Sequence, residues 1–384
     1  MLSVGAPTIM LAAGEASGDL HGAALCRGLK GLAPESRLVG MGGRGMAAAG
    51  MEVLVDVTAS AVVGGSEALS RVPRLYRALG RLRAVLEGPP RPAALVLIDF
   101  PEFNLRLARA ARRAGVPVVY FIPPQVWAWR GGRVRTIRRL VSLVLAVFPF
   151  EPPLYRAAGV PVAFVGHPLL DALADAPERD AARRELGLPR DARVLGLLPG
   201  SRREEIDRML PVMREAVLRI GRARPDVRVV LAQAPTVEGG ALARHLDGAP
   251  AVRTVAGHAH AVMRAADLLL LTSGTATLEA ALLGTPMVVC YRVSRLTALM
   301  VGLLVRVPWM SLVNLTLGRA VVPELYQASA TGERLAAEAL RLLDTPGALA
   351  GQRGAFRELA GRLGEPGVGL RAARLVLAEA RAAP

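Results

Sequence analysis

The chain has 384 residues, more than the length over which one hydrophobic core keeps growing, so we expect two domains. Its 48 basic and 32 acidic residues give a formal charge of +16, which favours an anionic partner such as a phosphorylated ligand, an anionic lipid or a nucleic acid. The two cysteines, Cys26 and Cys290, lie far apart and outside any metal-binding spacing, which argues against a disulfide framework or a structural metal and fits a reducing cytoplasm.

Short apolar runs alternate with longer amphipathic stretches along the first half of the chain. This pattern is typical of parallel strands covered by helices on both faces. The strands expected there are 8–13, 38–41, 94–98, 118–121, 143–148 and 163–164.

A charged stretch at 175–191 follows, bracketed by Pro177 and Pro189, and we interpret it as a linker. A second series of strands comes after it, at 194–198, 228–232, 251–255, 268–271 and 287–290. We therefore expect an α/β fold of two Rossmann-like, doubly wound domains, residues 1–174 and 192–365. An amphipathic helix at 366–384 would be able to return to the first domain.

A glycine-rich turn at 14–19 follows the first predicted strand and opens a helix. Free N–H groups and the positive end of the helix dipole make such a turn suitable for an anion. Glu15 and Ser17 are candidate catalytic residues there. The alternative is an ordinary tight turn in which Ser17 or Asp19 caps the helix.

The strand at 94–98 is apolar throughout, as expected for a strand buried on both faces, and Asp99 follows it directly. In open α/β sheets the ligand binds beyond the carboxyl ends of the strands, which makes Asp99 the candidate general base. Asn104, a few residues further on, is a candidate for acceptor contacts. A simple helix-capping role for Asp99 is the alternative.

Two of the three tryptophans, Trp127 and Trp129, follow the strand at 118–121, with Arg130 beside them. Tryptophan presents a flat apolar face that suits a sugar ring or an acyl chain, although a packing role would explain the pair equally well. The arginines continue through Arg139. They form either a solvated helix face or a contact with phosphate or lipid headgroups.

Two turns in the second half directly follow predicted strands and open helices. Their small residues would let a diphosphate approach the helix ends. The residues expected to hold it are Gly200, Ser201, Arg202, Ser273, Gly274 and Thr275. Glu279 would accept the ribose hydroxyls, unless both turns are ordinary capped turns. No Walker lysine follows either turn, which argues against a P-loop nucleotidase.

A basic amphipathic stretch at 61–86 interleaves apolar residues, among them Leu69 and Leu75, with five arginines. Such a stretch is able to lie in the interface plane of a membrane. The alternative is a helix that buries its apolar stripe in the core of the domain.

Taken together, these motifs resemble those of the lipid-A-disaccharide synthase family. They occur in order over most of the chain, at 14–19, 98–104, 126–130, 198–202, 273–279 and 311–315. The chain departs from the family pattern at Phe100, Glu102 and Val313. These departures concern acceptor contacts and the shape of a loop rather than the type of reaction.

The resemblance implies a GT-B glycosyltransferase with two domains facing across a cleft, which needs no cofactor and no metal. It would join UDP-2,3-diacylglucosamine to 2,3-diacylglucosamine 1-phosphate through a β-1,6 linkage and release UDP. Asp99 would act as the base, while Arg202, Ser273 and Thr275 would stabilise the departing UDP. The resemblance adds Asn314 to the donor site.

Acylated substrates imply a peripheral enzyme on the inner face of the inner membrane, with no nucleic-acid partner and with a homodimer left open. One rival is another GT-B sugar-nucleotide enzyme, such as the peptidoglycan glucosaminyltransferase or a UDP-sugar epimerase. A non-catalytic protein that binds anionic lipid or nucleic acid is the other. The ordered matches at Asp99 and at 127–130 favour the synthase.

Overall fold

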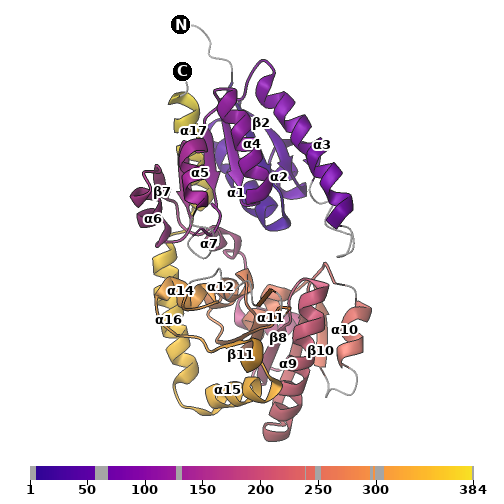
Figure 1. Ribbon diagram of the computed structural model, residues 1–384. Helices are drawn as coiled ribbons and strands as arrows, with labels where there is room; N and C mark the ends of the chain where they lie inside the picture. Colours follow the sequence, from indigo (N-terminus) through magenta and orange to yellow (C-terminus); the bar gives the residue numbers. More distant parts are fainter. Residues whose placement is uncertain are drawn as a thin grey trace. The chain divides into compact units, whose positions relative to one another are not determined.

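The computed structural model divides the chain into two compact units (Figure 1). The first unit contains Met1–Ala172 and Leu363–Pro384, and the second contains Leu173–Arg362. The residues that the structure describes are 6–56, 68–126, 132–237, 239–246, 252–294, 297–298 and 307–382.

The first unit is built on a seven-stranded parallel sheet in the order β3-β2-β1-β4-β5-β6-β7. Its strands are β1 Thr8–Ala13, β2 Arg37–Gly42, β3 Met51–Asp56, β4 Ala94–Ile98, β5 Val118–Phe121, β6 Leu143–Ala146 and β7 Val162–Phe164. Strand β4 is buried at every position, and Ala13 at the end of β1 pairs with Ile98 at the end of β4. The turns that follow these two strands therefore begin at the same edge of the sheet.

Helices cover both faces of this sheet (Figure 1). They are α1 Ala16–Leu32, α2 Arg44–Ala48, α3 Ala68–Glu87, α4 Pro101–Arg113, α5 Arg133–Leu140, α6 Glu151–Ala157, α7 Leu169–Ala172 and α17 Val368–Ala382. Parallel strands are joined by right-handed crossovers, so the connections toward β3 and those toward β7 lie on opposite faces. Helices α1 and α2 thus lie on one face, and α3 to α6 lie on the other.

The C-terminal helix α17 packs against α1 at close range. A Cβ atom on Gly369 would lie 2.7 Å from the backbone oxygen of Ala24, and one on Gly28 would lie 2.7 Å from the backbone oxygen of Gly369. Two glycines therefore allow the two helix backbones to approach each other.

The second unit has a six-stranded parallel sheet in the order β10-β9-β8-β11-β12-β13. The strands are β8 Arg193–Leu198, β9 Val227–Gln233, β10 Val252–Ala256, β11 Leu268–Thr272, β12 Met287–Tyr291 and β13 Glu324–Tyr326. The helices are α8 Arg179–Glu185, α9 Arg203–Ala223, α10 Gly239–Leu246, α11 Ala259–Ala265, α12 Thr275–Leu282, α14 Leu312–Leu317, α15 Gly332–Asp344 and α16 Ala348–Leu363, with a short 3-10 turn, η3 Gln327–Ser329.

The stretch expected to be a linker, 175–191, belongs to the second unit in the structure. Its helix α8 carries Arg183, whose side chain is only 2% exposed. The guanidinium donates to the backbone oxygen of Ala265 over 3.1 Å and pairs with Asp267 over 3.1 Å. One buried arginine therefore anchors a segment whose charged composition resembles that of a linker.

Two strands of the structure, β3 and β13, were not predicted from the sequence. Both lie at sheet edges, and most of their residues are only partly buried. Such strands lack the continuous apolar run by which central parallel strands are recognised. In the parts of the chain that the structure describes, no helix is long and apolar enough to cross a membrane.

Candidate active site

Asp19, near the start of α1, connects two glycine-rich turns of the first unit, the turn at 14–19 after β1 and the turn at 40–43 at the end of β2. Its buried carboxylate accepts hydrogen bonds from the backbone N–H groups of Gly43, Gly45 and Met46, at 2.7, 2.8 and 3.0 Å. The turn after β2 is therefore held against the turn after β1. Glu15 and Ser17, in contrast, are exposed. Sequence reasoning considered Asp19 only as a helix cap and missed this role, although a second glycine-rich run at 40–43 was the available signal.

Asp99 lies directly beyond the end of β4, in a left-handed backbone conformation with φ of +50°. Phe100 follows it with φ of +44°. The backbone oxygen of Asp99 accepts hydrogen bonds from the amide of Asn104 over 2.7 Å and from the hydroxyl of Tyr120 over 2.9 Å. These two side chains fix the turn that presents the Asp99 carboxylate.

The environment of Asp99 favours the protonated form of its carboxyl group. Burial raises the pKa of Asp99, and the negative charge of Glu15 raises it further. A hydrogen bond with the backbone of Phe100 acts in the opposite direction. A carboxylate with a raised pKa is a stronger base, which is the property that general-base catalysis requires.

Phe100, one of the departures from the family pattern, lies over the first turn. A Cβ atom on Gly14 would lie 2.0 Å from the Phe100 ring, so only glycine fits at this position. The ring also stacks on Phe103, with 5.7 Å between the ring centroids. Phe100 therefore brings an apolar surface up to the turn that carries Glu15.

Asn104, the candidate for acceptor contacts, lies inside the first unit. Its side chain is completely buried, and its amide nitrogen lies 3.2 Å from the backbone oxygens of both Ala12 and Ile98, in addition to that of Asp99. Asn104 joins the ends of β1 and β4. Its amide N–H group also donates to the backbone oxygen of Asp99 and so positions that residue.

Trp127, Trp129 and Arg130 lie outside the described residues. The arginines that continue this motif begin helix α5, where Arg133 forms an ion pair with Glu102 of α4. Glu102, a second departure from the family pattern, thus has a partner on the neighbouring helix.

In the second unit, the turn after β8 already holds a carboxylate. One oxygen of Glu205 accepts hydrogen bonds from the N–H groups of Ser201 and Arg202 at 3.1 and 3.3 Å, and the other lies 3.4 Å from the Arg202 guanidinium. A Cβ atom on Gly200 would lie 2.6 Å from the Glu205 carboxylate. These two N–H groups, which we expected to bind a diphosphate, are thus occupied by Glu205. The 75% exposed side chain of Arg202 is the cationic group that this turn offers to solvent.

The turn after β11 differs, because within the described residues no side chain caps the N-terminus of α12. The hydroxyl of Ser273 donates to the backbone oxygen of Met310 over 3.1 Å, which ties the turn to a neighbouring loop. Thr275 begins the helix. Strands β8 and β11 are neighbours in the sheet, so Arg202 and the α12 N-terminus lie at the same sheet edge. An uncapped helix N-terminus beside an exposed guanidinium suits a diphosphate.

Glu279, on the second turn of α12, has a histidine partner. Its carboxylate lies 3.4 Å from the Nε2 atom of His260 on α11. The hydrogen bond with Glu279 raises the pKa of His260, while its partial burial lowers it. Nothing in the sequence pairs His260 with a residue 19 positions away, so this contact was not predicted.

Asn314, expected from the resemblance in the donor site, is bonded within the second unit. This side chain is 1% exposed, and all its hydrogen-bonding groups are used within the unit. It donates to the backbone oxygen of Val322 and to Glu324, and accepts from the N–H groups of Val321 and Val322. Asn314 therefore holds the segment that leads into β13.

The basic stretch around helix α3 divides into two parts. Leu79, Leu82 and Leu86 belong to the core of the first unit, as the packing alternative predicted. Leu75 is 38% exposed. The side chain of Leu69 and residues 57–67 lie outside the described residues.

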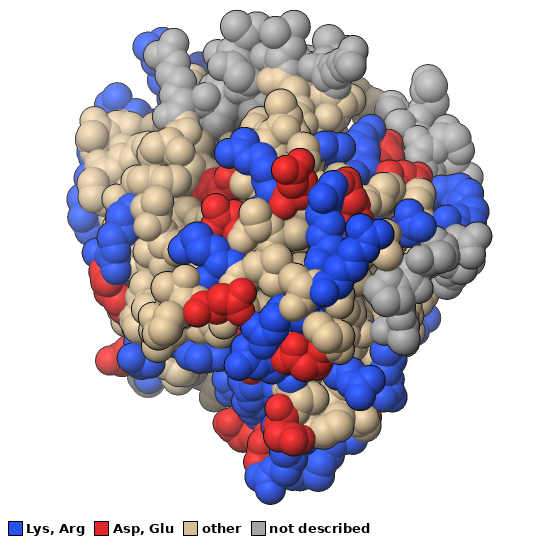
Figure 2. Space-filling view, turned by 90° about the horizontal axis from the view of Figure 1, so that it is seen from below, with Lys and Arg blue, Asp and Glu red and all other residues tan. Residues whose placement is uncertain are grey.

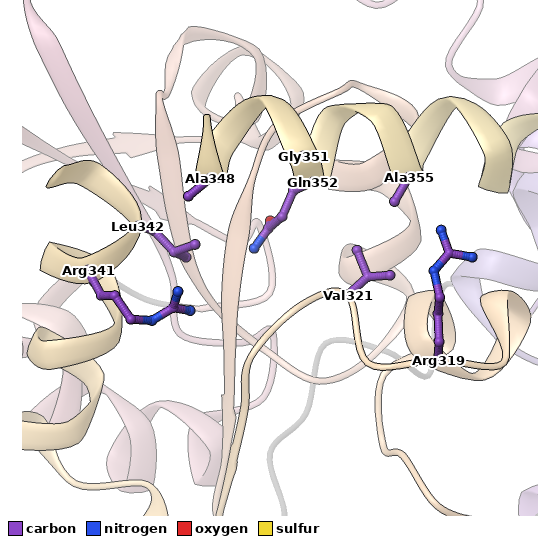
Figure 3. Close-up of a pocket in the computed structure, with 8 residues that line it drawn as sticks. All are labelled: Arg319, Val321, Arg341, Leu342, Ala348, Gly351, Gln352 and Ala355. Carbon is purple, nitrogen blue, oxygen red and sulfur yellow. The ribbon is translucent and has the colours of Figure 1, made fainter. Parts of the chain in front are cut away.

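A cavity of about 330 Å³ lies in the second unit, away from these turns (Figure 3). Its two arginines are paired: Arg319 with Glu358, through two bonds of 3.0 and 2.6 Å, and Arg341 with Glu338. Gln352 exchanges hydrogen bonds with the backbone of Met287. The polar side chains Arg319, Arg341 and Gln352 of the cavity lining thus all have partners within the protein. Among the described residues, no group of three or more His, Cys, Asp or Glu side chains lies close enough to hold a metal ion.

The chain contains two α/β units, each built on a parallel sheet. A carboxylate lies beyond a central strand of the first unit, and an uncapped helix N-terminus lies beside an arginine in the second. These features together define the class of protein. The chain has the architecture of the GT-B enzymes. A sequence profile described as lipid-A-disaccharide synthetase matches residues 9–352. The chain therefore belongs to the lipid-A-disaccharide synthase family and is a glycosyltransferase.

Relatives of that name align over nearly the whole chain. A lipid-A-disaccharide synthase from Geobacter sulfurreducens is 45% identical over 370 residues, which cover 96% of each chain. Another, from Myxococcus xanthus, is 44% identical over 373 residues, with 97% of each chain covered. The predicted family and fold class are thus confirmed.

Solved structures with the same fold include UDP-N-acetylglucosamine 2-epimerase from Neisseria meningitidis, bound to UDP-GlcNAc. It has a TM-score of 0.67 and 14% identity, over 97% of this chain and 100% of that chain. The MnaA protein of S. aureus, solved with UDP, also has a TM-score of 0.67 and 14% identity, over 95% and 94% of the two chains. At these identities the likeness concerns the fold alone.

Proposed function

We propose that this protein joins UDP-2,3-diacylglucosamine to 2,3-diacylglucosamine 1-phosphate, with inversion at the anomeric carbon, to give the β-1,6-linked disaccharide 1-phosphate and UDP. The observation that carries the proposal is the 45% identity to a lipid-A-disaccharide synthase across 96% of both chains. The epimerases share the fold at only 14% identity, which gives no comparable support for their reaction.

Asp99 is the proposed general base. Its carboxylate would take the proton of the acceptor 6-hydroxyl as that oxygen forms its bond to the anomeric carbon of the donor. The bond between this carbon and the UDP oxygen breaks at the same time, and its electron pair leaves with UDP. The turn fixed by Asn104 and Tyr120, together with the raised pKa of Asp99, supports this assignment.

The donor diphosphate is proposed to bind at the turn of Ser273, Gly274 and Thr275. The uncapped N-terminus of α12 and the guanidinium of Arg202 would stabilise the negative charge that develops on the departing UDP. Glu279, close to the same helix end, would accept the ribose hydroxyls.

The acceptor is proposed to bind through the first unit. Glu15 and Ser17 are exposed on the turn beside Asp99, and the motif of Trp127, Trp129 and Arg130 would contact the sugar or its acyl chains. Because both substrates carry acyl chains, we place the enzyme peripherally on the inner face of the inner membrane. The exposed side chain of Leu75 supports a membrane contact at α3.

Incubation of the purified protein with both substrates tests the reaction. We expect UDP and the disaccharide 1-phosphate in equal amounts, detected by mass spectrometry, with the β-anomeric proton seen by NMR. Interconversion of UDP-GlcNAc with its 2-epimer, without disaccharide, would instead place the protein with the epimerases and reject the proposal.

A further inference from the structure

A basic groove of about 590 Å³ lies between α5 and α6 in the first unit. Its lining includes three arginines, Arg135 and Arg138 from α5 and Arg156 from the end of α6, all of them exposed. The apolar part of the lining includes Val134 and Ala157. The groove thus combines guanidinium groups with a small apolar surface.

None of these three arginines forms an ion pair or a side-chain hydrogen bond within the parts of the chain that the structure describes. They are not needed to cap α6 either. The backbone N–H of Gly159 already donates to the oxygen of Arg156 over 2.9 Å, and that of Val160 donates to the oxygen of Tyr155 over 3.0 Å. Each guanidinium carries five N–H donors, so the groove offers a concentrated set of donors to an outside anion.

Arginines elsewhere in the molecule are arranged differently. In the cavity of Figure 3, Arg319 and Arg341 each have a glutamate partner. On the face of the molecule drawn in Figure 2, acidic side chains lie among the basic ones. Three like charges around one groove repel each other when no acidic side chain in the described part of the chain pairs with them, and a bound anion relieves this repulsion.

The groove borders a helical layer that is basic throughout. Five arginines lie on α3, four on α4 and four on α5, against only two acidic residues, Glu87 and Glu102. Both glutamates pair with arginines of the same layer, Arg83 and Arg133. Most of the excess positive charge of the chain is therefore concentrated on this layer, whose field attracts polyanionic surfaces.

We propose that the groove between α5 and α6 is a binding site for the phosphate of an anionic phospholipid headgroup. Arg135, Arg138 and Arg156 hold the phosphate oxygens, and Val134 and Ala157 contact the glycerol part. A bilayer, unlike a soluble phosphate ester, engages the groove and the basic layer beside it at the same time. This proposal rests on the peripheral membrane location proposed above and names a contact through which the protein binds the membrane. It is independent of the chemistry assigned to Asp99.

The test is binding of the full-length protein to phosphatidylcholine vesicles with and without phosphatidylglycerol, at physiological salt. We expect the triple variant R135Q/R138Q/R156Q to lose at least about tenfold in partitioning to the anionic vesicles, since each basic residue near an anionic surface strengthens binding about fivefold. The melting temperature and the transfer rate on detergent-dispersed substrates should stay unchanged. Unchanged melting shows that the loss does not come from unfolding, and unchanged transfer separates this site from the proposed active site.

A matched control removes the same charge from the neighbouring helix. R109Q/R112Q/R113Q changes three exposed arginines of α4 that lie outside the groove, and it should lose clearly less than the groove variant. Equal losses in the two variants would mean that binding depends only on the overall surface charge. That result would overturn the proposal of a discrete site. No loss in the groove variant would overturn it as well.

Glycerol 3-phosphate distinguishes the two sources of a phosphate group. We expect it to compete only weakly, at millimolar concentrations, for binding to anionic vesicles. Tight calorimetric binding of glycerol 3-phosphate that depends on the three arginines, with no preference for phosphatidylglycerol vesicles, would assign the groove to a soluble phosphate ester and overturn the lipid proposal.

Discussion

Asp99 and Phe100 are consecutive residues in the left-handed backbone conformation, which residues other than glycine rarely adopt. Each such residue costs about 1–3 kcal/mol unless its surroundings enforce the conformation. Here Asn104 and Tyr120 both donate to the backbone oxygen of Asp99, and Gly14 leaves room for the Phe100 ring. Strain of this kind is typical of sites where the direction of one side chain matters more than stability.

Replacing Asp99 with asparagine should lower turnover by about a hundredfold or more, because the amide cannot accept the acceptor proton. The fold and the affinity for UDP should be retained, as measured by thermal melting and calorimetry. Glu102→Gln, on the exposed side of α4, is the control and should keep most of its activity. Near-normal turnover in Asp99→Asn would mean that another group is the base.

The raised pKa of Asp99 predicts how activity depends on pH. A base works only when it is deprotonated, so the acidic limb of the kcat/KM profile should lie at higher pH than for an ordinary aspartate. Removing the nearby negative charge with Glu15→Gln lowers the pKa of Asp99 and should move this limb to lower pH. The same limb in Glu102→Gln should stay in place. A limb that moves up, or does not move, in Glu15→Gln would contradict the assignment.

In the donor site, Arg202→Ala and Glu279→Ala should each weaken UDP binding about tenfold or more, since hydrogen bonds to charged groups contribute about 1.5–3 kcal/mol. Calorimetry with UDP measures the effect. Arg203→Ala is the matched control, because Arg203 is the next residue in the chain, has a similarly exposed side chain and pairs with Asp207. Unchanged affinity for UDP in both site variants would mean that the diphosphate does not bind at these turns.

At the scale of elements, helix α3 shows why a sequence pattern alone cannot distinguish a membrane contact from a core contact. Both require an apolar stripe with arginines beside it. The tertiary packing decides, and it buries Leu79, Leu82 and Leu86 while leaving Leu75 38% exposed. A single helix therefore contains core residues toward its end and exposed apolar residues nearer its beginning.

Two single substitutions separate these parts of α3. Leu79→Ser should destabilise the protein by about 2–5 kcal/mol, because it removes a buried side chain from the core. Leu75→Ser should change stability by less than about 1 kcal/mol and reduce binding to anionic vesicles. Chemical denaturation and vesicle sedimentation check the two effects. A severe loss of stability in Leu75→Ser would place this residue in the core.

The central strands β1, β4, β5, β8 and β11 were predictable, since parallel strands buried on both faces are continuous apolar runs. The edge strands β3 and β13 were not, because partial burial breaks that run. The position of Asp99 at a strand end followed from the same logic. The internal roles of Asn104, Asn314 and Glu205 did not, because polar side chains in a motif look alike whether they bind a ligand or hold a turn.

At the scale of the whole molecule, the first unit is made from two separate stretches of chain. Residues before 173 form its sheet, and α17 joins it from beyond the second unit. Helices α1 and α17 meet through Gly28 and Gly369, with Cβ positions that would lie 2.7 Å from backbone oxygens. Larger residues cannot be accommodated there unless the two backbones separate.

Gly369→Val should therefore destabilise the first unit by about 1–3 kcal/mol or more, through overpacking between the two helices. Affinity for UDP, assigned to the second unit, should be retained at low temperature. Gly361→Val on α16, where a Cβ atom would meet no neighbour within 4 Å, is the control. Hydrogen exchange resolved along the chain should show faster exchange in α1 of Gly369→Val, and equal protection in the two variants would contradict this account of the contact.

The pairing of α1 with α17 also constrains the order of events on the ribosome. Helix α1 ends at Leu32, and its partner begins at Val368. At about 5–20 residues per second, roughly 20 to 70 s pass between the synthesis of the two helices. During that interval the second unit, which ends at Arg362, is synthesised, while the face of α1 that packs against α17 stays uncovered. The unit whose synthesis begins first can therefore be completed only after α17 has been made.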